Sequence, residues 1–176
     1  MKSILIIGLG RFGRHLCRKF MSLKNEVMIV DRDEAAVTAL ADEATSAQIA
    51  DCTDENALRA LGVKNFDLCF VCIGSDFASS LLITSMLKDM GAARGVAKAS
   101  QDIHAKLLLR NGADEVVYPE RDSAERMATR LSAQNVFDYI ESKAQTKGER
   151  VSEASRNFVN DCLNFVKEFV EKERKQ

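Results

Sequence analysis

A glycine-rich stretch close to the amino terminus has the residue types and spacing of a phosphate-binding loop. Gly8, Gly10 and Gly13 fit the pattern G-x-G-x-x-G, with the apolar run 3–7 before them and a helical pattern after them. Glycines permit a tight turn and a close approach of the backbone, and the first turn of a helix offers unpaired N–H groups to phosphate. The pattern therefore predicts a bound adenine nucleotide, and a glycine turn that serves only packing is the alternative.

Three charged residues extend this prediction to the rest of a nucleotide. Asp31 ends the apolar run 27–30, at the position, about twenty residues beyond the glycines, where a carboxylate accepts hydrogen bonds from ribose hydroxyls. It favours an unmodified ribose over a 2′-phosphate, although the adjacent Arg32 weakens that preference. Arg11 lies inside the glycine loop at the entrance of the predicted helix, where it either reaches a terminal phosphate or remains solvated.

Further polar residues follow other apolar runs. Asp51 comes just after the run 45–49, where it either contacts an adenine edge or makes a turn. Asp54 and Asp76 precede helical patterns, and N-capping explains them better than ligand binding. Lys98 and Glu120 also stand at strand ends, and such a pair suits proton chemistry as well as a grip on phosphate and metal.

The elements that position these residues alternate along the chain. Apolar runs typical of strands are separated by helical patterns, which predicts β-α-β units and a parallel sheet. We therefore expect an α/β fold, a doubly wound, Rossmann-like sheet of six strands in the order 3-2-1-4-5-6, with a C-terminal helical extension. The expected strands are 3–7, 26–30, 45–49, 67–73, 95–98 and 115–118, and the expected helices are about 11–23, 33–42, 54–61, 76–90 and 102–111.

Other catalytic and metal-binding patterns are weak. His15 and His104 fall within predicted helices, away from the strand ends, and the serines at 75, 79 and 80 lack a nucleophile elbow. Cys69 and Cys72 form a C-x-x-C pair inside a strand pattern, which turns them to opposite faces and predicts buried structural thiols. All five cysteines are expected to be reduced.

Composition excludes several classes of function. The net charge is −1 with acids and bases interspersed, so the basic surface of a nucleic-acid-binding protein is missing. No apolar stretch approaches the roughly twenty residues of a membrane span, and Met1-Lys2 leads straight into a strand instead of a signal peptide. We expect a cytoplasmic protein without direct membrane insertion.

Three segments are expected: a nucleotide-binding domain at 1–140, a polar linker at 141–152 and an amphipathic helical tail at 153–176. A helix over about 121–140 carries a face that packs either on its own sheet or on a second copy. The tail's apolar face suits either the chain's own domain or another subunit or partner. The first face comprises Ala124, Met127, Ala128, Leu131, Asn135 and Val136, and the second Phe158, Val159, Cys162, Leu163, Phe165, Val166, Phe169 and Val170.

The combination resembles the N-terminal lobe of KTN/RCK domains, the regulatory gating domains and subunits of Trk and Ktr potassium transporters and of potassium channels. The resemblance spans about residues 2–140. Its motifs are IIGLGRFG (6–13), VD (30–31), ADCTDE (50–55), LGVKNFD (61–67), AKA (97–99), GAD (112–114) and YPERD (118–122).

What this resemblance implies is a non-enzymatic regulator of potassium flux that binds NAD(H) or ADP/ATP and changes its oligomer conformation. Its partners would be a membrane transporter or channel subunit and further copies of itself, in a homodimer or a larger ring. A small NAD-dependent oxidoreductase is the alternative, but it needs a substrate pocket and a placed acid or base.

The resemblance also assigns roles to single residues. The glycine loop, including Arg11 and Phe12, would hold the phosphates and Asp31 the ribose, with Arg32 beside it. Asp51 and Cys52 would border the adenine, Ile73 and Gly74 would line the pocket, and Lys98 would face phosphate. Glu120 would lie near the terminal phosphates and a divalent cation.

Overall fold

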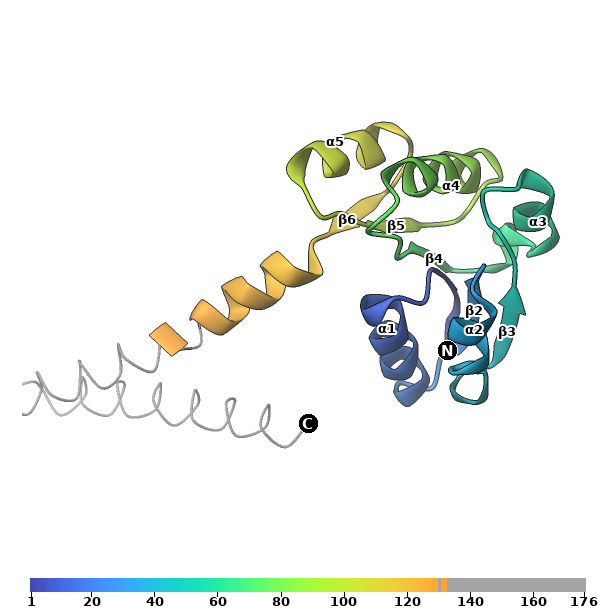
Figure 1. The fold of residues 1–176 in the computed structure, drawn as a ribbon, viewed down its shortest axis with the longest axis horizontal. Helices are drawn as coiled ribbons and strands as arrows, with labels where there is room; N and C mark the ends of the chain where they lie inside the picture. Colours follow the sequence, from blue (N-terminus) through green and yellow to red (C-terminus); the bar gives the residue numbers. More distant parts are fainter. Residues whose placement is uncertain (130, 133–176) are drawn as a thin grey trace, which may run out of the picture. The chain divides into compact units, whose positions relative to one another are not determined.

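A parallel β-sheet of six strands forms the centre of the fold (Figure 1). The computed structural model describes residues 1–129 and 131–132, and the chain divides into two compact units, Met1–Arg126 and Met127–Gln176. The strand order β3-β2-β1-β4-β5-β6 is the doubly wound order expected from the sequence. The strands are β1 (Ser3–Ile7), β2 (Glu26–Asp31), β3 (Ser46–Ile49), β4 (Leu68–Val71), β5 (Gly95–Lys98) and β6 (Glu115–Val117).

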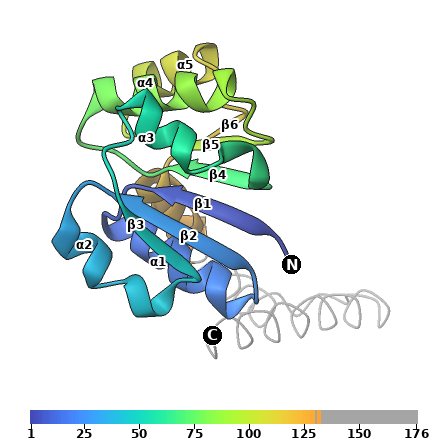
Figure 2. The same cartoon turned by 90° about the vertical axis from the view of Figure 1, so that its right-hand side faces the viewer.

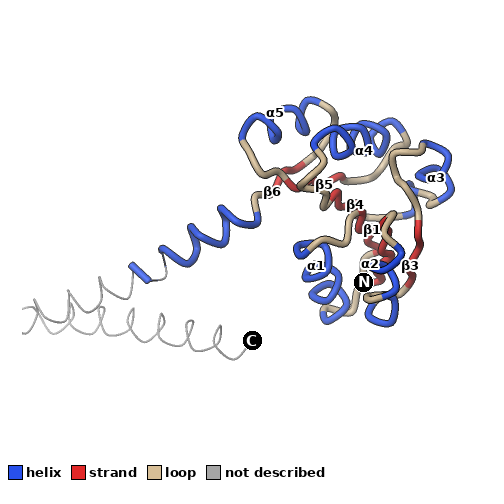
Figure 3. The backbone as a smooth tube through the Cα atoms, viewed as in Figure 1, coloured by secondary structure: helices blue, strands red, loops and turns tan. Residues whose placement is uncertain are grey.

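Helices alternate with these strands, and the helices expected between them are all present (Figure 3). The second is shorter than predicted, because the chain leaves the helical conformation at Leu40, whose φ is −122° and whose side chain is fully buried. A 3₁₀ turn, Ala41–Glu43, follows it, and another, Val63–Asn65, follows α3. The helices are α1 (Arg11–Ser22), α2 (Glu34–Thr38), α3 (Glu55–Ala60), α4 (Phe77–Asp89) and α5 (Asp102–Arg110).

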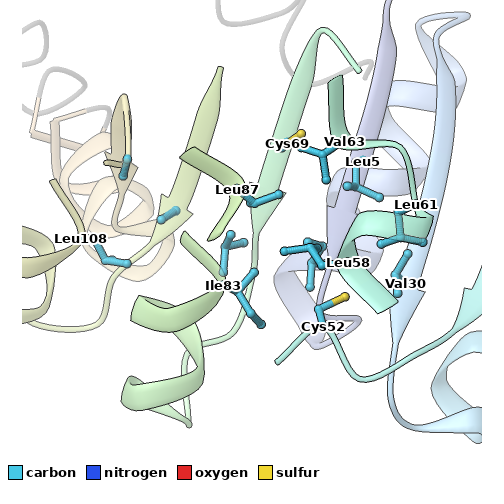
Figure 4. Close-up of a cluster of buried hydrophobic side chains, with 14 of the residues drawn as sticks. Leu5, Val30, Cys52, Leu58, Leu61, Val63, Cys69, Ile83, Leu87 and Leu108 are labelled. Carbon is cyan, nitrogen blue, oxygen red and sulfur yellow. The ribbon is translucent and has the colours of Figure 1, made fainter. Parts of the chain in front are cut away.

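The helices cover both faces of the sheet, α1 and α2 on one and α3 to α5 on the other (Figure 2). Side chains alternate between these faces, as a strand requires. On β1, Leu5 and Ile7 join the core beneath α3, α4 and α5, whereas Ile4 and Ile6 join the core beneath α1 and α2. Figure 4 shows Leu5 in the first of these cores. Burial on both faces explains the uninterrupted apolar runs.

The C-x-x-C pair has the structural role that its strand position predicted. Cys69 belongs to one core and Cys72 to the other, and both are free thiols. Burial raises the pKa of each thiol to about 12. Thiols in this environment stay protonated and react poorly.

Aspartates cap three of the helices. Asp33, Asp54 and Asp76 precede α2, α3 and α4, and each side chain accepts a hydrogen bond from a backbone N–H in the first turn. The capping role predicted for Asp54 and Asp76 is therefore confirmed. Helix α1 differs, because Gly10 stands at its N-cap and offers no side chain.

After β6 the chain turns directly into a further helix. Helical residues begin at Pro119 and are described through residue 129 and at 131–132. The N–H of Asp122 donates to the Tyr118 carbonyl at 2.8 Å, which closes the first turn. The predictions for residues 133–176, the linker and the tail among them, lie outside the described residues. Within the described part of the chain, no helix is long and apolar enough to cross a membrane.

Candidate nucleotide-binding cleft

A cleft opens at the carboxyl ends of the strands, where the sheet reverses its winding. Strands β1 and β4 are neighbours, but the chain continues from β1 into α1 on one face and from β4 into α4 on the other. Such a switch point separates the two loops and leaves a crevice that binds ligands in open α/β sheets. The cleft has a volume of about 210 Å³.

The structure brings most of the predicted site residues together in this cleft. Gly8, Gly10, Asp31, Arg32, Asp51, Cys52, Ile73 and Gly74 all line it. Its remaining walls are Ile7, Ala50, Thr53, Cys72, Ser75, Asp76, Ser79 and Ile83.

The three glycines of the loop have different reasons to be glycine. Gly8 has φ +96°, a left-handed conformation, and a Cβ there would lie 3.1 Å from Ile73. A Cβ on Gly13 would lie 2.1 Å from the carbonyl oxygen of Gly8, so this helix residue packs directly against the loop. A Cβ on Gly10 would meet no atom of the described chain within 4 Å. Gly8 and Gly13 thus serve the fold, whereas Gly10 leaves open space at the helix entrance.

The amino end of α1 is suited to an anion. The first-turn N–H groups of a helix have no acceptor inside that helix, and they carry partial positive charge. Here Gly10 supplies no capping side chain, the first turn contains no acid, and Arg11 is the first helical residue. With Gly10 lining the cleft, the N–H groups and the open glycine fit the phosphates of a nucleotide.

Asp31 connects the end of β2 to the glycine loop. One carboxylate oxygen accepts a hydrogen bond from the Leu9 N–H at 2.6 Å, and the other accepts from the Asp33 N–H at 3.0 Å. Each carboxylate oxygen can accept more than one hydrogen bond. Asp31 can therefore hold the loop in place and still accept from ribose hydroxyls in the cleft.

Two further carboxylates and one guanidinium line the same end of the cleft. Asp51 accepts from the backbone N–H of Thr53 at 2.9 Å and from its hydroxyl at 2.7 Å, and these bonds, hydroxyl first, lower the pKa of Asp51. The hydroxyl and N–H of Ser79 lower the pKa of Asp76 in the same way. Arg32 contributes to both shifts. Asp51 thus makes the predicted turn and also lines the cleft, and its contact with an adenine edge stays a prediction.

Lys98 and Glu120 meet beside the cleft, next to Gly74. The Lys98 ammonium lies 2.9 Å from a Glu120 carboxylate oxygen. A Cβ on Gly74 would lie 3.4 Å from Cε of Lys98, so the lysine stem runs along that glycine. The hydrogen bond from Lys98 is the largest cause that lowers the pKa of Glu120, and Arg11 contributes.

The remaining predicted residues do not form the lining of the cleft. Arg11, Lys98 and Glu120 stand beside it, Gly13 lies under the loop, and Phe12 packs against the core beneath α1. Ser79 and Ile83 were missed by the sequence argument. They lie three and seven residues after Asp76, and this helical spacing places all three on one face of α4.

Neither histidine lines the cleft. His15 is exposed on α1, and His104 is buried in α5 against Phe77, with ring centroids 4.5 Å apart. Burial lowers the pKa of His104, and its ring nitrogens have no hydrogen-bond partner in the described part of the chain. The described lining therefore contains no imidazole for acid–base chemistry.

Comparison with known proteins identifies the family. Residues 4–119 match the model of the TrkA-N domain, and this chain belongs to that family.

Two curated relatives are similar over most of the chain. Ktr system potassium uptake protein C of Bacillus subtilis is 44% identical over 140 residues, and Ktr system potassium uptake protein A of the same species is 40% identical over 140 residues. Each match covers 80% of this chain and 63% of the relative. The chain thus spans less than two thirds of the length of these relatives.

Solved structures share the fold at lower identity. The TrkA-N domain of the inner membrane protein YbaL of Escherichia coli has a TM-score of 0.66 at 19% identity and covers 74% of this chain and 96% of that one. The Kef C-terminal domain of Shewanella denitrificans in its AMP-bound form has a TM-score of 0.63 at 23% identity, and the match covers 81% of this chain and 92% of that one. The GsuK channel bound to NAD has a TM-score of 0.60 at 20% identity, and the match covers 66% of this chain and 21% of that one.

Proposed function

We propose that this chain is a nucleotide-binding regulatory domain of a potassium uptake system. The observation that carries the proposal is the amino end of α1, which lines the switch-point cleft with an open glycine and no capping side chain. Donors left unpaired at this position fit the phosphates of an adenine nucleotide. Membership of the TrkA-N family supports the regulatory role.

The relatives and structural neighbours support the choice of the proposed ligand and the proposed partner. The Ktr proteins are potassium uptake proteins, and the structural neighbours include forms bound to NAD, ADP and AMP. The proposed ligand is NAD(H) or ADP/ATP. The proposed partner is the membrane subunit of a potassium transporter or channel, which this domain contacts from the cytoplasm.

Nucleotide binding is tested by thermal unfolding and calorimetry with NAD, NADH, ADP and ATP, since a ligand of the native state raises apparent stability. The variant is Gly10→Ala, whose methyl group enters the open space without touching the described chain. Gly95→Ala, at the start of β5, is the matched control. Loss of binding in Gly10→Ala alone supports the site, and a folded wild-type chain that binds none of the four nucleotides contradicts it.

A divalent cation is proposed only together with ATP. The described residues contain no cluster of three or more histidine, cysteine or acidic side chains able to hold a metal. A cation beside Glu120 would therefore depend on phosphate oxygens for its other ligands. ATP titrations with Mg²⁺ and with chelator, on wild type and Glu120→Gln, test this part.

Assembly is the proposed output of nucleotide binding. On the helix that follows β6, Met127 and Leu131 are each 52% exposed, and such apolar side chains suit an interface between copies. A ligand shifts an assembly equilibrium only through its different affinities for the two states. Light scattering with and without nucleotide tests this, and a monomer under both conditions contradicts it.

A further inference from the structure

The ion pair beside Gly74 joins the end of β5 to the helical turn after β6, close to the backbone hydrogen bond from the Ala99 N–H to the Val117 carbonyl. Lys98 ends β5, and Glu120 belongs to the helical turn that begins at Pro119, after β6. The Lys98 side chain is only 16% exposed, whereas that of Glu120 is 70% exposed. The lysine is therefore held in place, and the carboxylate reaches to it from the solvent side.

Glu120 faces both cations on this side of the cleft. Its carboxylate bonds to Lys98 at 2.9 Å and also feels the charge of Arg11 at the entrance of α1. Arg11 at the start of α1 and Lys98 beside Gly74 are also close to where phosphates on the glycine loop would lie under the proposed function. A carboxylate and a phosphate both carry negative charge and accept hydrogen bonds from an ammonium group, so they compete for Lys98.

We infer that Glu120 is a built-in competitor of phosphate, and that a bound nucleotide takes Lys98 away from it. This inference rests on the proposed function, because it requires a nucleotide phosphate beside Lys98. In the ligand-free chain Glu120 pairs with Lys98. When phosphate binds without a divalent cation, Lys98 turns its hydrogen bonds to the phosphate oxygens, and the Glu120 carboxylate returns to water.

The change of partner at Lys98 affects the helix after β6, because Glu120 is the second residue in the first turn of that helix. Its neighbours are attached elsewhere: Tyr118 donates its hydroxyl to Asp102 at 3.0 Å, and Arg121 pairs with the same carboxylate at 3.2 Å. Within the described residues, side chains at the start of this helix thus attach to Lys98 and to Asp102. Phosphate removes the first attachment and leaves the second.

The test measures ADP binding by calorimetry in chelator, so that no divalent cation contributes. Its variants are Glu120→Gln, Lys98→Gln and the double variant. Glu115→Gln is the matched control, since Glu115 forms a comparable surface pair with Arg94 at the other end of β6. Hydrogen exchange of residues 122–126 provides a readout that does not depend on affinity.

We expect Glu120→Gln to bind ADP roughly three- to ten-fold more tightly than wild type, because the competing charge is gone. The control should bind as wild type does, and the gain should vanish when Lys98 is also replaced. ADP should speed exchange at 122–126 in wild type, whereas Glu120→Gln should exchange quickly without ADP.

Two failures can be told apart. If wild type binds ADP and Glu120→Gln binds it equally or more weakly in chelator, the inference is overturned and the proposed function stands. If the folded wild type binds none of the four nucleotides, the proposed function fails, and this inference with it.

Discussion

The two ends of the cleft satisfy their polar groups in opposite ways. At the end formed after β2, β3 and β4, the carboxylates of Asp31, Asp51 and Asp76 all accept hydrogen bonds from nearby backbone N–H groups. At the end formed by α1, the helix begins at a glycine without a capping side chain. The carboxylates therefore already accept bonds from the chain and can accept more, whereas no side chain of the described residues caps the donors at the entrance of α1.

This difference gives a ligand an orientation. Anionic groups are favoured at the uncapped helix and beside Arg11 and Lys98, where positive charge collects. Hydroxyl and amino groups, which donate hydrogen bonds, are favoured at the carboxylate end. A nucleotide with its phosphates on the glycine loop and its ribose at Asp31 satisfies both ends.

The largest expected effect separates the glycine that serves the fold from the glycine that leaves space for a ligand. Gly13→Ala places a methyl group 2.1 Å from the Gly8 carbonyl oxygen, and should lower the free energy of unfolding by about 3 kcal/mol or more. Urea unfolding measures this loss. Gly10→Ala, at an N-cap without a capping side chain, should stay within about 1 kcal/mol of wild type, and equal losses in both variants would contradict the distinction.

The next effect concerns the carboxylate end. Asp31→Ala removes the acceptor proposed for ribose hydroxyls. It should weaken the binding of every adenine nucleotide by about 1.5–3 kcal/mol, roughly ten-fold or more in affinity. Calorimetry on folded protein measures it. Asp33→Ala is the control, because it removes only the cap of α2 and should leave affinity unchanged. Full affinity in Asp31→Ala would remove Asp31 from the site.

The loss of affinity caused by substitutions at the phosphate end of the cleft should depend on which nucleotide is bound. Arg11→Ala removes a charge at the helix entrance. It should therefore weaken the binding of ATP several-fold more than the binding of NAD, which has no terminal phosphate. Competition binding with both ligands measures the ratio. Lys19→Ala, in the last turn of the same helix, controls for net charge. Equal losses for ATP and NAD would show that Arg11 does not distinguish a terminal phosphate.

The fold could be predicted because each local pattern agreed with it. Apolar runs identified the central strands β1, β2, β4 and β5, which contain the buried residues of the sheet, and aspartates identified helix starts at Asp54 and Asp76. The break of α2 at Leu40 could not be predicted, since Leu40 continues the helical spacing and only its burial in the core shows where the helix ends. Tertiary contacts override local preference at such positions.

The candidate site was predictable where it follows strand ends and less so elsewhere. Strand ends converge at one edge of a parallel sheet, which brought Gly10, Asp31 and Asp51 together from sequence alone. Ser79 and Ile83 reach the cleft from within α4, so their position depends on how that helix turns against the sheet. The pairing of Lys98 with Glu120 depends likewise on where the chain goes after β6.

The smallest expected effect is the acid sensitivity of the carboxylate end. Hydrogen bonds from Ser79 hold the pKa of Asp76 below the ordinary value of 3.8. A carboxyl group whose pKa is lowered in the folded state stabilises it above the ordinary pKa, and this contribution is lost as the pH falls through the lowered value. The contribution of Asp76 to stability should therefore be constant near neutral pH and should decline below about pH 4. Asparagine also caps helices well, so Asp76→Asn should fold and lose slightly less stability on acidification. Urea unfolding at pH 7 and pH 3 measures the difference, and a steeper acid loss in Asp76→Asn would show that the charged carboxylate does not stabilise the start of α4.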